Sequence, residues 1–261
     1  MLRCLTTVAA LLAIGPYRME IVKWRHQKEA ALKADGGWLT VTGLVWLKEG
    51  DNRVAPAPGV FELHNGKTVF RAGSGAITQM KPDTTITVGK LIFTVIERGG
   101  RYGVRIKDND SKQRAEFQGQ RWFPVREQYR VTARFVAQQK SIAIPNVLGD
   151  TLQLTSPGYA VFQIAGQELR LEPVIEDKEL FFIFRDQTAG RETYGAGRFL
   201  YTETPKNGMV ELDFNKAENP PCAFTPYATC PLPPRQNILP VRIEAGELAP
   251  AGTLKHATQF R

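Results

Sequence analysis

The sequence is poor in the residue types that most often hold metal ions or carry thiol chemistry. Its 261 residues include only three cysteines and three histidines. His26, His64 and His256 are scattered, and the step of eight residues between Cys222 and Cys230 is wider than the short spacings of structural zinc sites. We therefore predict no metal site and no cofactor.

Motifs of several large enzyme classes are also missing. There is no Walker loop, G-x-S-x-G elbow, H-E-x-x-H helix or dinucleotide-binding fingerprint. The formal net charge is +8, but the basic residues form no run of four or more, so we expect a solvated basic surface and no nucleic-acid partner. No apolar stretch reaches the roughly 20 residues that a transmembrane helix needs, so we expect no integral membrane segment.

Residues 1–15 have the pattern of a secretory signal. Arg3 precedes a short apolar stretch over residues 5–14, and small residues follow at Ala13 and Gly15. The pattern predicts a signal peptide and a periplasmic or secreted protein. The alternatives are an apolar extension of the following helix and a cytoplasmic location.

One amphipathic helix is predicted over residues 17–33. Apolar residues that include Ile21 and Trp24 recur at helical spacing, and Gly36-Gly37 ends the pattern. Lys28 falls on the same stripe, where its methylene stem can pack while its ammonium group reaches water. We expect this helix to pack across the end or face of a sheet.

After Gly37 the apolar residues alternate with a period of two, which is typical of strands. Asn65-Gly66 and Gly99-Gly100 are expected hairpin turns, because these residues accept positive φ at low cost. The expected strands cover residues 38–42, 44–47, 60–63, 68–71, 77–80, 85–88, 91–97, 102–106, 129–136, 141–144, 151–154, 159–164, 168–174, 180–184, 210–214 and 239–243.

The predicted fold is therefore mainly β, built of antiparallel sandwich-like or barrel-like modules with one N-terminal α-helix packed on them. We expect the helix and a first β module within residues 16–118. A second β module is expected within residues 119–261, unless the two modules form one continuous domain.

Candidate site chemistry is concentrated in residues 180–237, where polar residues, glycines and prolines separate short apolar runs. Arginine binds carboxylate or phosphate groups through two parallel hydrogen bonds, so we expect a small acidic or hydroxyl-rich ligand. The same residues would also serve as an internal Arg–Asp network that only fixes a turn. The ligand-binding candidates are Arg185, Thr188, Thr193, Tyr194, Arg198, Asn215 and Tyr227.

Asp186 and Asp213 are the candidate catalytic residues. Asp213 and Asn215 share one face of an expected strand, and a strand beside the 180–200 hairpin would bring Asp213 toward Asp186. Two carboxylates with different pKa values perform general acid/base catalysis. The alternative function is therefore a metal-independent hydrolase or lyase, with Arg198 stabilising developing negative charge.

Cys222 and Cys230 lie in a proline-rich loop. A disulfide between them would close a ring worth about 2.5 kcal/mol in the chain-entropy picture, and it would suit an exported protein. The alternative is that Cys222 and Cys230 are buried thiols that form no disulfide. The prolines also favour a rigid turn that presents Tyr227, so a third hypothesis is a cell-envelope protein with this loop as its contact surface.

Short motifs are spread from residue 24 to residue 247, within the stretch 17–247. They are W-R at 24–25, G-W-L-T at 37–40, G-L-x-W-L at 43–47, F-R-D-x-T-x-G at 184–190, T-Y-x-A-G-R at 193–198, L-D-F-N at 212–215, N-P-x-C-A at 219–223, C-P-L-P-P at 230–234 and A-G-E at 245–247. On these motifs the chain resembles a bacterial domain-of-unknown-function family, numbered 1684. The resemblance implies a β-rich prokaryotic protein and brings no mechanism. The chain departs from the family pattern at Glu218, where that pattern has an aromatic residue.

Overall fold

The structure is a computed structural model that describes residues 15–251, so nearly all of the expected signal peptide lies outside the described residues. No helix in this described part is long and apolar enough to cross a membrane.

The helices are α1 (Pro16–Lys33) and α2 (Lys112–Ala115), with 3-10 turns η1 (Trp38–Thr40), η2 (Glu127–Tyr129), η3 (Phe214–Lys216), η4 (Pro221–Ala223) and η5 (Arg235–Asn237). The strands are β1 (Val41–Trp46), β2 (Gly50–Asn52), β3 (Gly59–His64), β4 (Lys67–Ala72), β5 (Ile77–Gln79), β6 (Thr85–Val88), β7 (Leu91–Arg98), β8 (Arg101–Asp108), β9 (Arg130–Pro145), β10 (Thr151–Ile164), β11 (Gln167–Leu171), β12 (Val174–Glu176), β13 (Glu179–Phe184), β14 (Arg198–Thr202) and β15 (Met209–Asp213).

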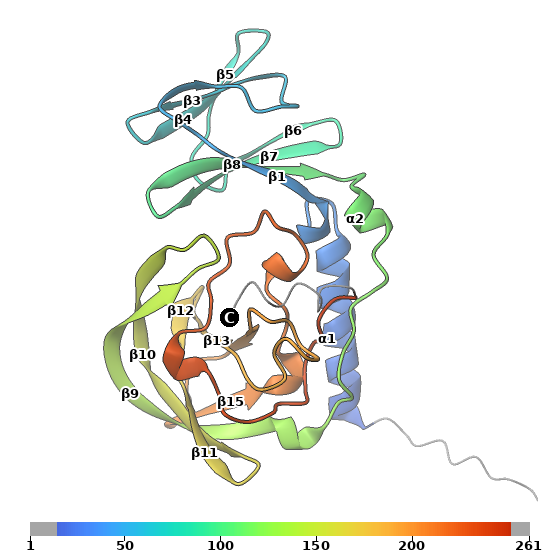
Figure 1. Cartoon of the computed structure of the whole chain (residues 1–261), viewed down its shortest axis with the longest axis vertical. Coiled ribbons are helices and arrows are strands. Elements are labelled where there is room, and N and C mark those ends of the chain that lie inside the picture. The colour runs from blue at the N-terminus through green and yellow to red at the C-terminus, as the bar shows by residue number, and fades with distance from the viewer. Residues whose placement is uncertain (1–14, 252–261) are drawn as a thin grey trace, which may run out of the picture.

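The strands form four antiparallel sheets in two groups, which lie one above the other in Figure 1. The first module, residues 41–108, holds the sheets β1-β8-β7-β6 and β2-β3-β4-β5 around a core that includes Phe61 and Phe93. The second module, residues 130–249, holds the sheets β11-β10-β9-β15 and β12-β13-β14, with Phe182 and Phe214 in its core. The prediction of a mainly β, antiparallel fold with an N-terminal helix is confirmed.

The two expected hairpin turns are present. Asn65 and Gly66 have φ values of 49° and 72° and join β3 to β4. Gly99 and Gly100 have φ values of 58° and 75° and join β7 to β8. Positive φ at both central positions gives the turn the twist of the strands it connects.

Several expected strand limits are wrong. Four short strands are predicted between residues 129 and 164, but the structure has two long ones, β9 and β10. The two strands stay paired on both sides of a bulge at Ser156/Gly158. Residues 38–40 form the 3-10 turn η1, not the start of a strand. The expected strand over residues 239–243 is irregular, although Leu239 and Val241 are buried. Its backbone pairing with the segment 185–187 consists of two hydrogen bonds, from the Leu239 N–H to the Arg185 carbonyl and from the Gln187 N–H to the Val241 carbonyl.

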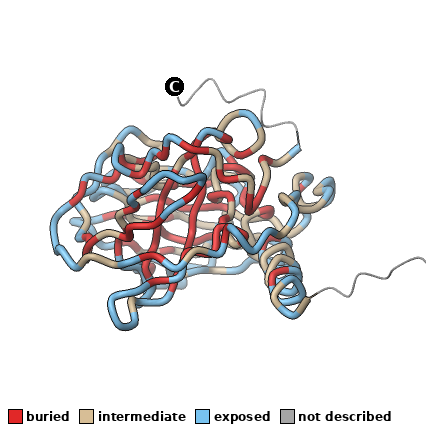
Figure 2. The backbone as a smooth tube through the Cα atoms, turned by 90° about the horizontal axis from the view of Figure 1, so that it is seen from below, coloured by how far each residue is buried: buried red, intermediate tan, exposed pale blue. Residues whose placement is uncertain are grey.

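Helix α1 is confirmed, and it packs mainly on the second module. Figure 2 shows the helix at the edge of the molecule, mostly exposed or intermediate, and its buried residues are Ile21 and Leu32. The Tyr17 hydroxyl donates to Asp213 Oδ1 at 2.9 Å, and the Arg25 guanidinium donates to the Phe123 carbonyl at 3.1 Å. The ammonium group of Lys28, whose side chain is 37% exposed, pairs with Glu218 at 3.0 Å.

Candidate functional site

A cavity of about 680 Å³ lies where α1, the first module and the second module meet. Cavities of this size and position are typical of small-molecule sites. Helix α1 contributes Lys28 and Leu32 to the lining, η1 contributes Trp38, and the first module contributes Arg98 and Arg105. The lining residues that follow the first module include Gln120, Ile144, Leu154, Val174, Phe181, Ile183, Phe199, Tyr201, Glu218, Asn219, Cys230 and Glu247.

Most of the wall is apolar and belongs to the second module. Ile144, Val174 and Ile183 are buried members of one hydrophobic cluster. Phe181 in the same cluster stacks on Tyr201, with ring centroids 4.6 Å apart. The wall therefore suits a ligand with an apolar body.

The cavity lining includes an arginine that has no acidic partner among the described residues. Arg105 lies on β8, where alternate residues such as Val104 and Ile106 point into the first core and leave Arg105 on the other face. Arg105 is only 7% exposed, and its guanidinium stacks 4.8 Å from the ring centroid of Trp38. Within residues 15–251 no carboxylate pairs with it, and its Nε has no hydrogen-bond partner. Burial, followed by the nearby charge of Arg98, lowers the pKa of Arg105 to about 10.

Another part of the lining gathers carboxylate and amide groups. Glu247 is 1% exposed, and it accepts hydrogen bonds from the Asn219 N–H at 2.8 Å and from Gln120 Nε2 at 2.9 Å. Burial raises the pKa of Glu247 to about 8, against the lowering effect of these bonds. Glu218 pairs with Lys28, and burial raises its pKa also. Perturbed carboxyl groups in a cavity are typical of functional sites.

A second, acidic cavity of about 980 Å³ adjoins the first. The two share Lys28, Glu176, Tyr201 and Glu218 in their linings. The Lys28–Glu218 ion pair therefore stands at the boundary between an apolar cavity and an acidic one.

The predicted residues Asp186, Thr188, Thr193 and Arg198 come together, but as a buried network. The Arg198 guanidinium pairs with Asp186 at 2.5 Å, with side-chain exposures of 2% and 1%. Thr188 donates from both its backbone N–H and its hydroxyl to Asp186 Oδ1, and its hydroxyl lies 2.9 Å from that of Thr193. None of the four lines either cavity described above. Their mutual bonds are those of an internal network that fixes the turn.

Asp213 and Asn215 belong to a different cluster. Asp213 Oδ1 accepts hydrogen bonds from the Tyr17 hydroxyl and from the Asn215 N–H. The Asn215 amide also bonds both backbone groups of Arg126, so the pair ties α1 to the segment before β9. Asp186 and Asp213 thus have separate partners, and their acid/base role stays a prediction.

Cys222 and Cys230 are neighbours and are present as free thiols. The Cys222 N–H donates to Cys230 Sγ at 3.2 Å, and the Tyr194 hydroxyl donates to the Cys222 carbonyl at 2.9 Å. A hydrogen bond from the Cys230 thiol lowers the pKa of Cys222. Of the predicted site residues, Cys230 alone lines the apolar cavity.

The two remaining candidates lie apart from these groups. Tyr227 is 37% exposed and lines neither cavity described above. Arg185 is half-buried, and its backbone bonds Asn237 and Leu239. The predicted residues therefore do not surround one shared hollow.

Sequence reasoning missed Arg105, although a signal was present. Arg101, Arg105 and Lys107 alternate with apolar residues along β8, which places several cations on one face of a strand. Glu247 gave no such signal, because it lies in an irregular segment with no strand alternation.

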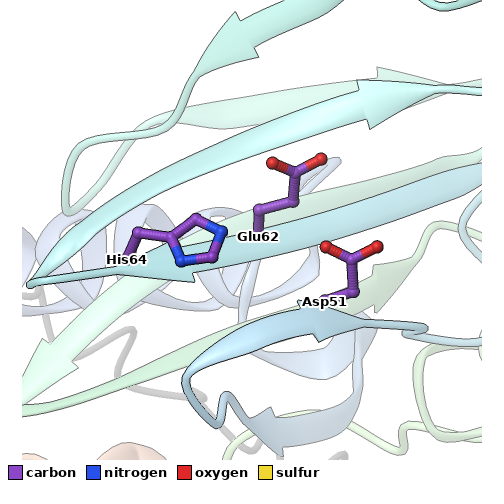
Figure 3. Close-up of side chains that lie close together, drawn as sticks. All are labelled: Asp51, Glu62 and His64. Carbon is purple, nitrogen blue, oxygen red and sulfur yellow. The ribbon is translucent and has the colours of Figure 1, made fainter.

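One group of possible metal ligands occurs in the described chain, although the sequence predicts none. Asp51, Glu62 and His64 lie together on β2 and β3, with one ligand atom of each within 4.8 Å of the others (Figure 3). Arg71 pairs with both carboxylates, through Nε to Glu62 and through Nη2 to Asp51 at 3.0 Å. Its charge already compensates them, so we assign no function to this group.

Comparison with known proteins gives one family match. Residues 115–248 match the family model described as Protein of unknown function (DUF1684). A solution NMR structure of an uncharacterized protein from Haloarcula marismortui is 31% identical, covering 52% of this chain and 78% of that chain, with a TM-score of 0.44. That structural likeness carries no argument about the cavity. No curated protein matches the chain.

Proposed function

Because this chain belongs to the DUF1684 family, whose description names no activity, we propose a function from the cavity alone. The protein binds a small organic anion with an apolar body, and a carboxylate is the simplest such ligand. The anionic group lies against Arg105, and the apolar body lies along the wall around Phe181.

The observation that carries this proposal is the unpaired charge of Arg105. A buried cation without a partner is costly, and proteins usually pair such groups or leave them in water. Arg105 is buried, faces a cavity and has no acidic partner in the described chain. A bound carboxylate would supply the missing charge through the two-pronged geometry that guanidinium groups favour.

The test removes the charge while keeping the length of the side chain. Octanoate, titrated by calorimetry, is expected to bind the wild type and to bind Arg105→Met about ten-fold to a hundred-fold more weakly, the value of a charged hydrogen bond. Arg101→Met is the matched control, because Arg101 also stacks on a tryptophan at 4.8 Å but is exposed and paired with Asp150. Equal affinity of wild type and Arg105→Met would contradict the proposal, as would no binding of any carboxylate from hexanoate to dodecanoate.

We also propose that the protein is exported and that Cys222 and Cys230 form a disulfide there. The contact between Cys230 Sγ and the Cys222 N–H supports this pairing, because it places the two residues side by side. Oxidation would transfer two electrons and two protons to a disulfide-forming partner of that compartment.

Thiol titration of the denatured protein tests the disulfide. Protein secreted into the periplasm without reductant is expected to show no reactive thiol at Cys222 or Cys230, and two after reduction. Two reactive thiols before reduction would overturn the proposal. The Cys222→Ser variant is the control, since its lone Cys230 stays reactive under both conditions.

A further inference from the structure

We propose that the ligand carries a primary ammonium group at its far end, held by Gln120, Asn219 and Glu247. The ligand is then a zwitterion with an apolar body between its two charges. This inference rests on the proposed function, and it names the class of molecule that the cavity takes.

Two amide oxygens at this end lack a donor. Gln120 Nε2 donates to Glu247, and Asn219 Nδ2 donates to the Leu248 carbonyl at 2.8 Å, so both amide groups are held in one orientation. Their oxygens, Gln120 Oε1 and Asn219 Oδ1, are buried and have no hydrogen-bond partner within the described residues. Asn219 is only 6% exposed. Buried acceptors without a donor are rare, and here both belong to residues that line the cavity.

Glu247 supplies the third acceptor. An ammonium group has three donors and no acceptor, which matches two amide oxygens and one carboxylate. Burial keeps Glu247 protonated at neutral pH, because its pKa is raised to about 8. The charged groups that face it are Glu218 beside it and Arg25 of α1, while Lys28 is already paired with Glu218. An ammonium group at this place would favour the ionised form of Glu247.

The charged and polar groups of the lining belong to different parts of the fold. Arg98 and Arg105 come from β7 and β8 of the first module. Glu218, Asn219 and Glu247 come from irregular segments that follow β15 in the second module. The apolar wall is a third part of the lining, so the cavity offers each kind of group that a zwitterion with an apolar body would contact.

The experiment compares ligands that differ only at the far end. Octanoate, ω-hydroxyoctanoate and ω-aminooctanoate are titrated into the wild-type protein at pH 7 in two buffers of different ionisation enthalpy. The amino acid is expected to bind about ten-fold more tightly than octanoate, the value of hydrogen bonds to a charged group. Its binding is also expected to release a proton as Glu247 ionises.

The outcomes separate this inference from the proposed function. If octanoate binds but ω-aminooctanoate binds no more tightly and releases no proton, the inference is wrong and the proposed function stands. Preference for ω-hydroxyoctanoate likewise overturns it. If none of the three binds, both fail.

A variant pair assigns the effect to Glu247. Glu247→Gln is expected to lose the preference for the amino group and the proton release. Glu244→Gln is the control, because Glu244 is a near neighbour in sequence that pairs with Arg126 and Arg242 outside the cavity. Proton release that persists in Glu247→Gln would refute the assignment.

Discussion

At the scale of single residues, two buried arginines show the difference between a structural and a binding role. The Arg198 guanidinium pairs with Asp186 and also donates to the carbonyls of Ala245 and Ile243. Arg105 is nearly as buried, but its guanidinium stacks on the ring of Trp38 and pairs with no carboxylate of the described residues. Arg198 has its charge compensated within the protein, whereas in the proposed function the ligand supplies the partner of Arg105.

The two arginines should therefore respond oppositely to the same substitution. Arg198→Met leaves Asp186 as an uncompensated buried charge and is expected to lower the free energy of unfolding by about 3–5 kcal/mol. Arg105→Met removes such a charge and is expected to leave that free energy unchanged or higher. Urea denaturation of both variants and the wild type measures the difference. A larger loss in Arg105→Met than in Arg198→Met would show that Arg105 is structural.

Glu247 predicts a pH dependence of stability. Its folded pKa is raised from 4.5 to about 8, so the native state holds the proton more tightly than the unfolded state. Stability is then lost as pH rises from about 4.5 to about 8, and the loss is complete above that range. Glu247→Gln cannot ionise, so its stability relative to the wild type should rise through this window. Thermal unfolding at several pH values checks this, and a constant gap between the two proteins would contradict it.

At the scale of elements, the long strands β9 and β10 depend on one glycine. Gly158 sits in the bulge between them with φ of 154°, and a Cβ there would meet the Val136 carbonyl oxygen at 2.1 Å. The sequence pattern predicts two separate strands here, over residues 151–154 and 159–164. The bulge instead absorbs the proline and glycine within the ladder, which a local pattern does not reveal.

A pair of glycine variants tests this bulge. Gly158→Ala is expected to lower the free energy of unfolding by about 2 kcal/mol or more. The clash of the added Cβ with the Val136 carbonyl oxygen adds to the cost of an alanine at positive φ. Gly149→Ala is the control: its φ is 88°, but nothing lies within 4 Å of the added Cβ, so about 1 kcal/mol is expected. Chemical denaturation measures both, and equal losses would mean that the Val136 contact is unimportant.

At the scale of the whole molecule, the sequence predicted the fold better than the site. Strand alternation, the turns at Asn65-Gly66 and Gly99-Gly100 and the helix α1 depend on local patterns, and they were found. The cavity depends on contacts between distant segments, from Lys28 to Glu247, which no local pattern contains. The polar residues concentrated after residue 180, such as Asp186 and Arg198, bond one another instead of facing that cavity.

The most direct measurement is the position of a bound ligand in a crystal. The central claim is that a small organic anion occupies the cavity with its charge at Arg105. Crystals grown with ω-bromooctanoate would locate the carboxylate by its density and the far end by the anomalous signal of bromine. The account predicts the carboxylate on Arg105, the chain along the wall around Phe181, and the bromine beside Gln120, Asn219 and Glu247. A ligand bound elsewhere, or a cavity that stays filled only by water, would contradict it.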